Sequence, residues 1–338
     1  MKEALYYQSE KEGKVRCTLC PHRCLLAEEQ SGLCGVRRNI GGRLYSLVYE
    51  KAIALHVDPI EKKPLFHVYP GSSSFSLATM GCNFKCRFCQ NHEISQVHLS
   101  SSRQISGESV SASQAVQMAR QQGCKTLACT YTEPTVFFEY ALEVGKKARE
   151  DGLQMVWISN GYISAKPLQE IARFLLAANI DLKSWNEDFY RHEIGGDLSS
   201  VLETLVRMKK LGVWLEVTTL IIPGVNDSES ELQSIAHFIA NDLGPETPWH
   251  ISRFYPHFKT THLSPTPIEV LHRAREIGIE NGLRYVYCGN VPGEEGEHTF
   301  CYQCHERIIQ RFGFHVLQNK LCKGCCPVCS APIDGIFS

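Results

Sequence analysis

The stretch FSLATMGCNFKCRFCQN, residues 75–91, joins a short apolar run to three closely spaced cysteines. The run at 75–79 has the composition of a buried strand, and Cys82, Cys86 and Cys89 follow it directly. Thiolates at these spacings can converge on an iron-sulfur cluster, whose irons normally take four cysteine ligands. A zinc knuckle or a ferredoxin-type cluster would take its fourth ligand nearby. Three thiols leave one metal position open, and we therefore predict a catalytic cluster.

Strands and helices are expected to alternate beyond this loop. Further strands are predicted at 126–131, 154–159, 179–183, 213–222 and 249–254, with an extra one at 284–288. Helices are predicted at 111–123, 166–178 and 199–212. Repeated β-α-β units favour a parallel sheet with right-handed crossovers, either doubly wound or a partial barrel.

Functional side chains of such a fold gather where the parallel strands end. A residue directly after a strand is therefore more informative than one inside it. Beyond the cysteine loop, the residues at these positions are Glu133, Asn160, Asp181, Lys183, Asn226 and His257.

The cysteine loop resembles that of radical S-adenosylmethionine (SAM) enzymes, whose fold is a partial (β/α)6 TIM-like barrel within the α/β class. The resemblance implies a [4Fe-4S] cluster on Cys82, Cys86 and Cys89, with Phe88 beside the cofactor. SAM would chelate the open iron. It also implies reductive cleavage of SAM to a 5'-deoxyadenosyl radical, which abstracts hydrogen from a substrate.

Motifs at later strand ends resemble those of pyruvate formate-lyase activating enzymes. TYTEPT places Glu133 where that group holds the methionine amino group of SAM, and DLK places Lys183, beside Asp181, where it faces the SAM carboxylate. SNG contains Asn160, and FYPH contains His257, which the resemblance places near the SAM ribose.

Other positions depart from the activating enzymes. Tyr131 and Thr132 replace glycines before Glu133, Ile158 replaces an aspartate, and Thr218 replaces an arginine. The first hypothesis is therefore an oxidoreductase that abstracts hydrogen from an unidentified substrate. The alternative within this class is an activase of a glycyl-radical enzyme.

A resemblance along nearly the whole chain is to the radical SAM proteins of the AmmeMemoRadiSam system. It rests on CTLCPHRC and GLCGVR within 17–37, ALHVDPIEKKPLFHVYPG at 54–71, YTEPT, and YVYCGNVPG at 285–293. Members of that group are often labelled as activating enzymes by similarity.

Two further groups of cysteines flank the predicted barrel. The N-terminal group could hold zinc or an auxiliary iron-sulfur cluster; it comprises Cys17, Cys20, Cys24 and Cys34. The C-terminal group predicts a zinc-ribbon or rubredoxin-like site with zinc or iron; it comprises Cys301, Cys304, Cys326 and Cys329. A CKGC pair, Cys322 and Cys325, could replace the last two.

These features predict three parts. Residues 1–70 form a Cys-rich metal-binding segment with a linker, 71–290 form the barrel, and 291–338 form a C-terminal module with a four-cysteine metal site. Such a module is too short to bury much core and needs its metal to fold.

The charge composition limits the partners that we expect the protein to bind. The 338 residues include 35 basic and 36 acidic side chains, so the net charge of -1 favours neither nucleic acid nor a membrane surface. No secretion signal or apolar run of about 18 residues is recognisable, so we expect a cytoplasmic protein with reduced cysteines. Its expected partners are SAM, an electron donor such as flavodoxin or ferredoxin, and a protein substrate.

The alternative of another class is a Cys-rich nucleic-acid-binding protein. Its basis is the C-terminal segment, in which basic residues accompany Phe312 and Phe314 and could contact phosphates and bases. The basic residues are Arg307, Arg311, Lys320 and Lys323.

Overall fold

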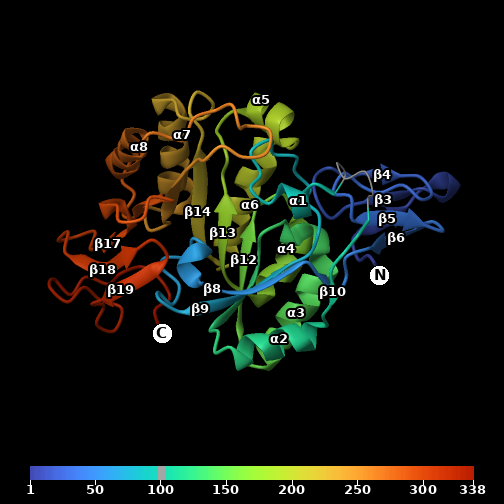
Figure 1. Ribbon diagram of the computed structural model, residues 1–338, viewed down its shortest axis with the longest axis horizontal. Coiled ribbons are helices and arrows are strands. Elements are labelled where there is room, and N and C mark those ends of the chain that lie inside the picture. The colour runs from blue at the N-terminus through green and yellow to red at the C-terminus, as the bar shows by residue number, and fades with distance from the viewer. Residues whose placement is uncertain (98–103) are drawn as a thin grey trace.

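The computed structural model describes residues 1–97 and 104–338. Its centre is one eight-stranded sheet. In chain order the strands are β8 (Ala54–Pro59), β9 (Ser73–Ala78), β11 (Thr126–Cys129), β12 (Gln154–Ser159), β13 (Leu175–Asp181), β14 (Trp214–Ile221), β15 (Trp249–Arg253) and β16 (Val286–Gly289). These strands lie side by side in the same order, with β8 antiparallel to β9 and all other neighbours parallel. The sheet remains open between β8 and β16, so the predicted α/β partial-barrel class is confirmed (Figure 1).

Helices pack along this sheet between successive strands. The longer ones are α2 (Ala112–Gln121), α3 (Phe138–Glu150), α4 (Ala165–Ile171), α6 (Leu198–Lys210), α7 (Glu229–Phe238) and α8 (Ile268–Glu280). Short helices α1 (His92–Ser95) and α5 (Glu187–Phe189) lie on loops. Side chains of Ser111, Asp197 and Ser228 cap α2, α6 and α7 by accepting backbone N–H groups. Among the described helices, none has both the length and the apolar character required to cross a bilayer.

The expected helix at 166–178 is wrong in its second half. Helix α4 ends at Ile171, a 3-10 turn covers Ala172–Phe174, and β13 already begins at Leu175. Strand β13 is paired on both sides and mostly buried, and its first four residues, Leu175–Ala178, are all apolar. Leucine and alanine favour helices intrinsically, and an apolar run cannot distinguish a buried strand from a buried helix.

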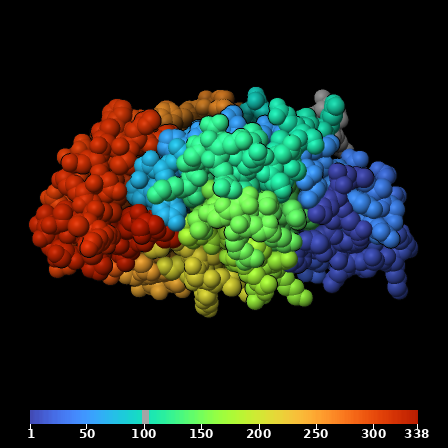
Figure 2. Space-filling view, turned by 90° about the horizontal axis from the view of Figure 1, so that it is seen from below, coloured from blue at the N-terminus to red at the C-terminus, as the bar shows by residue number. Residues whose placement is uncertain are grey.

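The two ends of the chain form small antiparallel sheets at opposite ends of the molecule (Figures 1 and 2). The N-terminal region also pairs two short strands with each other. Its strands are β1 (Lys2–Glu3), β2 (Tyr7–Ser9), β3 (Val15–Cys17), β4 (Leu25–Leu26), β5 (Arg37–Ile40), β6 (Arg43–Ser46), β7 (Lys51–Ala52) and β10 (Glu108–Ser109). The C-terminal strands are β17 (Thr299–Phe300), β18 (Arg307–Phe312) and β19 (His315–Asn319).

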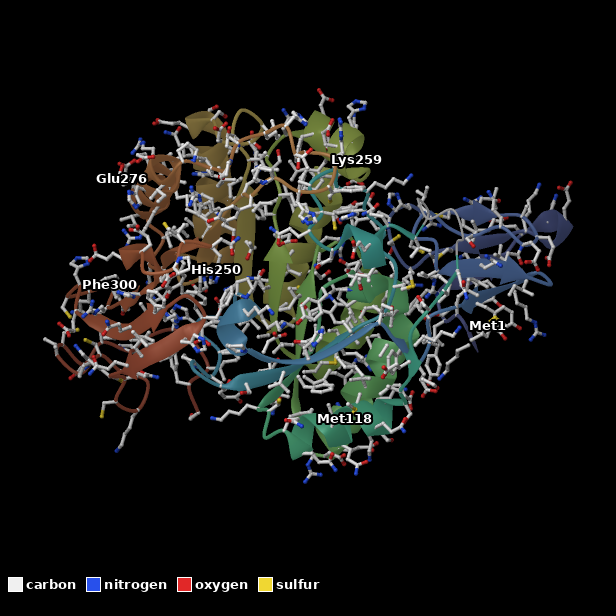
Figure 3. All side chains as sticks on the ribbon, viewed as in Figure 1. Met1, Met118, His250, Lys259, Glu276 and Phe300 are labelled. Atoms are coloured by element: carbon white, nitrogen blue, oxygen red, sulfur yellow. The ribbon has the colours of Figure 1, made fainter. Side chains whose placement is uncertain are left out.

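The segment that follows β8 packs against the inside of the curved sheet. Ile60, Leu65 and Val68 form a buried cluster with residues of β11, β12 and β13. The Glu216 carboxylate in β14 accepts the backbone N–H groups of residues 66 and 67, each at 2.9 Å. It also forms a hydrogen bond with Nε2 of the buried His250, at 2.6 Å; His250 is labelled in Figure 3. These contacts fix the segment to the sheet.

The C-terminal module is docked through a buried arginine. Arg311 donates to the Phe66 carbonyl at 2.9 Å and to Thr299 Oγ1 at 2.7 Å. Its Nε lies 3.6 Å from a Glu61 carboxylate oxygen, and both side chains are fully buried. A buried charge is tolerated only when it is paired and hydrogen-bonded, so this arginine ties the module firmly to the barrel.

Candidate functional site

The carboxyl ends of the parallel strands surround a large pocket with about 1650 Å³ of empty space, part of it open to solvent. The structure brings most of the residues predicted for the site together on its wall. They are Cys82, Cys86, Phe88, Cys89, Glu133, Asn160, Asp181 and Lys183. His257 is not among the lining residues; it is exposed on a loop, with its ring centroid 5.3 Å from that of His92.

The cysteine loop leaves β9 through a tight approach to the N-terminal region. Gly81 has φ of 102°, and a Cβ on it would lie 2.6 Å from Val36 Cγ1, so only glycine fits without rearrangement. The Phe84 N–H donates to Cys82 Sγ at 3.4 Å, and Ser95 Oγ lies 3.2 Å from Cys89 Sγ. The turn after the strand therefore aims its thiols into the pocket.

Two of the loop thiols have pKa values above the ordinary range. Burial, together with the nearby Glu133 carboxylate, raises the pKa of the Cys82 thiol well above its ordinary value. Burial raises the pKa of Cys86 to about 12. A metal must therefore displace these protons when it binds, which couples its affinity to pH.

The spacing of these thiols fits a multi-iron cluster better than a single metal ion. One zinc ion with Zn–S bonds of about 2.3 Å places its sulfurs about 3.8 Å apart. In residues 1–97 and 104–338, only the C-terminal quartet brings three or more ligand atoms within 4.8 Å of one another. No fourth cysteine of these residues lines the pocket. The three thiols would thus hold a [4Fe-4S] cluster with one open iron, which when bound supplies an electron and a chelation site for SAM.

Glu133 presents a buried carboxylate with one oxygen nearly unused. Its Oε1 accepts the Thr135 N–H at 2.9 Å, the Thr135 hydroxyl at 2.6 Å and the Ser159 hydroxyl at 2.8 Å. Among the described residues, only the Asn160 N–H donates to its Oε2, at 2.9 Å, so this oxygen retains capacity for another donor. Burial raises the pKa of Glu133, and a cationic donor would lower it again. The geometry suits a bound ammonium group.

Asn160 connects this carboxylate to the cysteine loop. Its side-chain N–H group donates to Asn83 Oδ1 at 2.8 Å and lies 3.7 Å from Cys82 Sγ. Its Oδ1 accepts the Tyr162 N–H at 2.9 Å. The amide is therefore fixed on both sides, and it holds the end of β12 against the loop.

Lys183 supplies the cation on the opposite side of the pocket. Its Nζ donates to Asp181 Oδ2 at 2.7 Å and lies 6.0 Å from the centroid of the Phe88 ring. Burial lowers the pKa of Lys183, but the Asp181 carboxylate outweighs burial and the net shift is upward. The ammonium group stays charged at neutral pH and can attract a carboxylate.

Residues that precede β9 also line the pocket. They could not be predicted from the criterion that functional residues directly follow a parallel strand. Lys62 and Lys63 line it, and their Nζ atoms donate to the Asp58 carboxylate at 2.8 and 2.7 Å. The Tyr131 hydroxyl donates to the same carboxylate. Phe314 of the C-terminal module lines the pocket as well. The only sequence signal for these residues was the motif at 54–71, which contains Asp58, Lys62 and Lys63.

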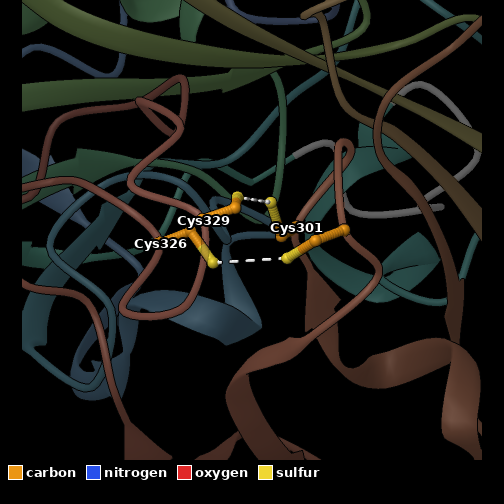
Figure 4. Close-up of side chains that lie close together, drawn as sticks. Cys301, Cys326 and Cys329 are labelled. Carbon is orange, nitrogen blue, oxygen red and sulfur yellow. Dashed lines mark hydrogen bonds between the residues drawn. The ribbon is translucent and has the colours of Figure 1, made fainter.

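The C-terminal quartet forms a compact metal centre (Figure 4). Cys301 Sγ lies 3.5 Å from Cys329 Sγ, and Cys304 Sγ lies 3.6 Å from Cys326 Sγ. All four sulfurs lie within 4.8 Å of one another, a separation that suits one tetrahedral ion. The structure thus brings together the CPVC pair, rather than the CKGC pair, with the two cysteines of CYQC.

The N-terminal cysteines line a different pocket on the other side of the loop. This pocket has about 370 Å³ of empty space, and Asn83 forms part of its wall. Cys17, Cys20, Cys24 and Cys34 all face it.

Comparison with known proteins places the chain in a family. The model of the radical SAM superfamily matches residues 77–239. An uncharacterized protein of Methanocaldococcus jannaschii is 45% identical over 340 residues, covering 99% of each chain. A second protein of that organism, provisionally named a glycyl-radical enzyme activating enzyme, is 22% identical over 214 residues, 62% of this chain and 78% of the relative.

Among solved structures, a radical SAM methyltransferase from Sphaerobacter thermophilus shares the fold with a TM-score of 0.52 at 16% identity. The similarity covers 68% of this chain and 71% of the methyltransferase. The chain contains a domain of the radical SAM superfamily at residues 77–239 and is similar to proteins named as activating enzymes of glycyl-radical enzymes. It is therefore an enzyme of SAM-dependent radical chemistry, whose family uses a [4Fe-4S] cluster. Its place in the AmmeMemoRadiSam group stays a prediction.

Proposed function

We propose that this enzyme reductively cleaves SAM in the pocket at the strand ends, and that the resulting 5'-deoxyadenosyl radical abstracts hydrogen from a substrate bound beside it. The observation that carries the proposal is the convergence of three widely spaced thiols, a buried carboxylate and a partly buried ammonium on one pocket. Neither a structural metal site nor an electron-transfer protein would need the last two groups there.

The side chains divide the binding of SAM among them. Glu133 Oε2 accepts a hydrogen bond from the amino group of SAM, and Lys183 attracts its carboxylate. Asn160 fixes the position of Glu133 relative to the cysteine loop, because its backbone N–H bonds to Glu133 and its side chain bonds to Asn83. Phe88 forms an apolar wall, stacked on Phe189 with ring centroids 6.1 Å apart. His257 remains our predicted neighbour of the ribose.

Production of 5'-deoxyadenosine tests the proposal directly. The protein is reconstituted anaerobically with iron and sulfide, reduced chemically and given SAM. The wild type should release 5'-deoxyadenosine, and Cys86→Ala should release none. A fully loaded and reduced wild type that leaves SAM intact would overturn the proposal.

Glu133→Gln tests the amino-group contact separately. Losing a hydrogen bond to a charged group costs about 1.5–3 kcal/mol, so the KM for SAM should rise about 10- to 150-fold. Glu143→Gln, at a half-exposed position in α3, is the matched control and should leave the KM unchanged. Equal KM values for the two variants would remove Glu133 from the site.

A glycyl-radical activase is the second candidate, favoured by the name of the relative at 22% identity. In this case the substrate is a protein, and the part of the pocket lined by Lys62, Lys63 and Phe314 would receive its glycine-bearing segment. An organic radical on a purified partner, detected by electron paramagnetic resonance after incubation with SAM, would establish this function.

The remaining assignments follow from the chemistry. An external one-electron donor such as flavodoxin or ferredoxin supplies the electron, zinc or iron binds the C-terminal quartet, and sixteen free cysteines favour the cytoplasm. The nucleic-acid-binding alternative loses one of the four basic residues on which it was based, because Arg311 is buried and hydrogen-bonded to Phe66 and Thr299.

A further inference from the structure

The four N-terminal cysteines surround one pocket in the N-terminal region. Cys17 and Cys34 are buried, and Cys20 and Cys24 are partly buried, on its wall. Its empty space of about 370 Å³ is partly open to solvent. Apolar side chains, including Leu19 and Leu26, form much of the remaining wall.

The spacing of the N-terminal thiols can be compared with that of the C-terminal quartet in the same protein. The C-terminal quartet holds its sulfurs within 4.8 Å of one another and makes two S···S contacts, of 3.5 and 3.6 Å. No three of the N-terminal thiols, all of which belong to the described part of the chain, meet the same 4.8 Å limit. Like the loop thiols, they are spread around a space rather than gathered at a point. Ligands on separate irons of a cluster are spread in this way, because the irons and bridging sulfides lie between them.

A buried arginine adds a fixed positive charge. Arg37 lines the pocket and is only 2% exposed. Its two terminal nitrogens bind Glu139, whereas its buried Nε has no hydrogen-bond partner among the described residues. Buried polar groups are nearly always satisfied, so an unpaired donor in the wall points to a missing anionic acceptor.

We propose that Cys17, Cys20, Cys24 and Cys34 hold a second [4Fe-4S] cluster, closed by four thiolates, rather than a zinc ion. The wide spacing of the thiols and the unpaired Arg37 Nε favour the cluster. Zinc would require the compact arrangement seen at the C-terminus.

The second cluster would lie directly behind the cysteine loop. Asn83 lines the N-terminal pocket, and the preceding residue, Cys82, lines the SAM pocket. The ring of His22, between two of the four cysteines, bonds through Nε2 to the Asn83 carbonyl at 2.8 Å. Two consecutive residues of the chain thus line the two sites, and the electron spins should interact when both clusters are reduced.

A variant without the loop thiols isolates the proposed cluster and does not depend on the proposed function. The full-length triple variant Cys82→Ala, Cys86→Ala, Cys89→Ala is reconstituted anaerobically, and its iron and acid-labile sulfide are measured. We expect about four sulfides per chain, because neither zinc nor a rubredoxin-like iron at the C-terminus contains sulfide. A sulfide content near zero would overturn the proposal, and two sulfides per chain would overturn the four-iron form.

Controls separate loss of the cluster from loss of the fold. Adding Cys17→Ser and Cys20→Ser to the triple variant should remove the sulfide, whereas adding Cys322→Ser, at an exposed cysteine outside both quartets, should not. The wild-type holoenzyme gives an independent measurement. It should contain about eight sulfides per chain and show spin coupling in its reduced resonance spectrum, and four sulfides without coupling would contradict the proposal.

Discussion

Replacing Glu139 by glutamine should loosen the N-terminal region from the barrel. Glu139 in α3 binds Arg37 in β5 through two parallel hydrogen bonds, of 2.7 and 2.9 Å. The same carboxylate accepts the Leu5 N–H at 2.9 Å. Both charged side chains are at most 2% exposed. In Glu139→Gln the arginine would remain charged and buried without its carboxylate partner.

The size of the effect follows from burial. Breaking a buried ion pair on one side costs about 3–5 kcal/mol. Unfolding entropy of about 2.1 cal/mol/K per residue gives roughly 0.7 kcal/mol/K for 338 residues. The thermal midpoint should therefore fall by about 4–7 °C.

The assay is thermal unfolding of anaerobic holoprotein, with equal iron content checked in each variant. Glu143→Gln removes an exposed partner 3.9 Å from Lys146 on the same helix and should shift the midpoint by less than about 1.5 °C. Arg37→Met combined with Glu139→Leu removes both charges and should recover most of the loss. If Glu139→Gln behaves like the Glu143 control, the buried charge is not what holds the region in place.

Three further changes test other parts of the structure. Burial lowers the pKa of Lys63 from 10.5 to about 8, so between these pH values the unfolded chain binds more protons than the folded protein, and stability should rise with pH. Lys63→Met should flatten this rise in the thermal midpoint. A pH profile equal to that of the wild type would show that Lys63 does not cause the rise. Gly81→Ala should cost about 1–3 kcal/mol by strain and overlap with Val36, measured by thermal unfolding, against a smaller loss for Gly212→Ala, where a Cβ meets no atom within 4 Å. Cys301→Ser should release the C-terminal metal and make that module sensitive to protease; resistance equal to wild type would show that the module folds without metal.

Much of the site was predictable because parallel strands end at one edge. Glu133, Asn160 and Lys183 lie far apart in sequence, yet each follows or ends a predicted strand, and all line one pocket. The loop cysteines were predictable for a different reason, since spacing along a single loop already limits how thiols can converge. The first residues of β13, Leu175–Ala178, were predicted as helix because leucine and alanine favour helices intrinsically and an apolar run does not distinguish a buried strand from a buried helix.

Local spacing and periodicity along the chain were enough to predict the alternation of strands and helices from β9 onward, the three-thiol loop and the two flanking groups of cysteines. Which surfaces meet was decided by tertiary packing alone. Packing placed Lys63 at the pocket and paired Arg37 with Glu139. It also gathered one quartet tightly and spread the other around a cavity. Distances between sulfurs are set by how separate segments pack, and no pattern along the chain contains that information.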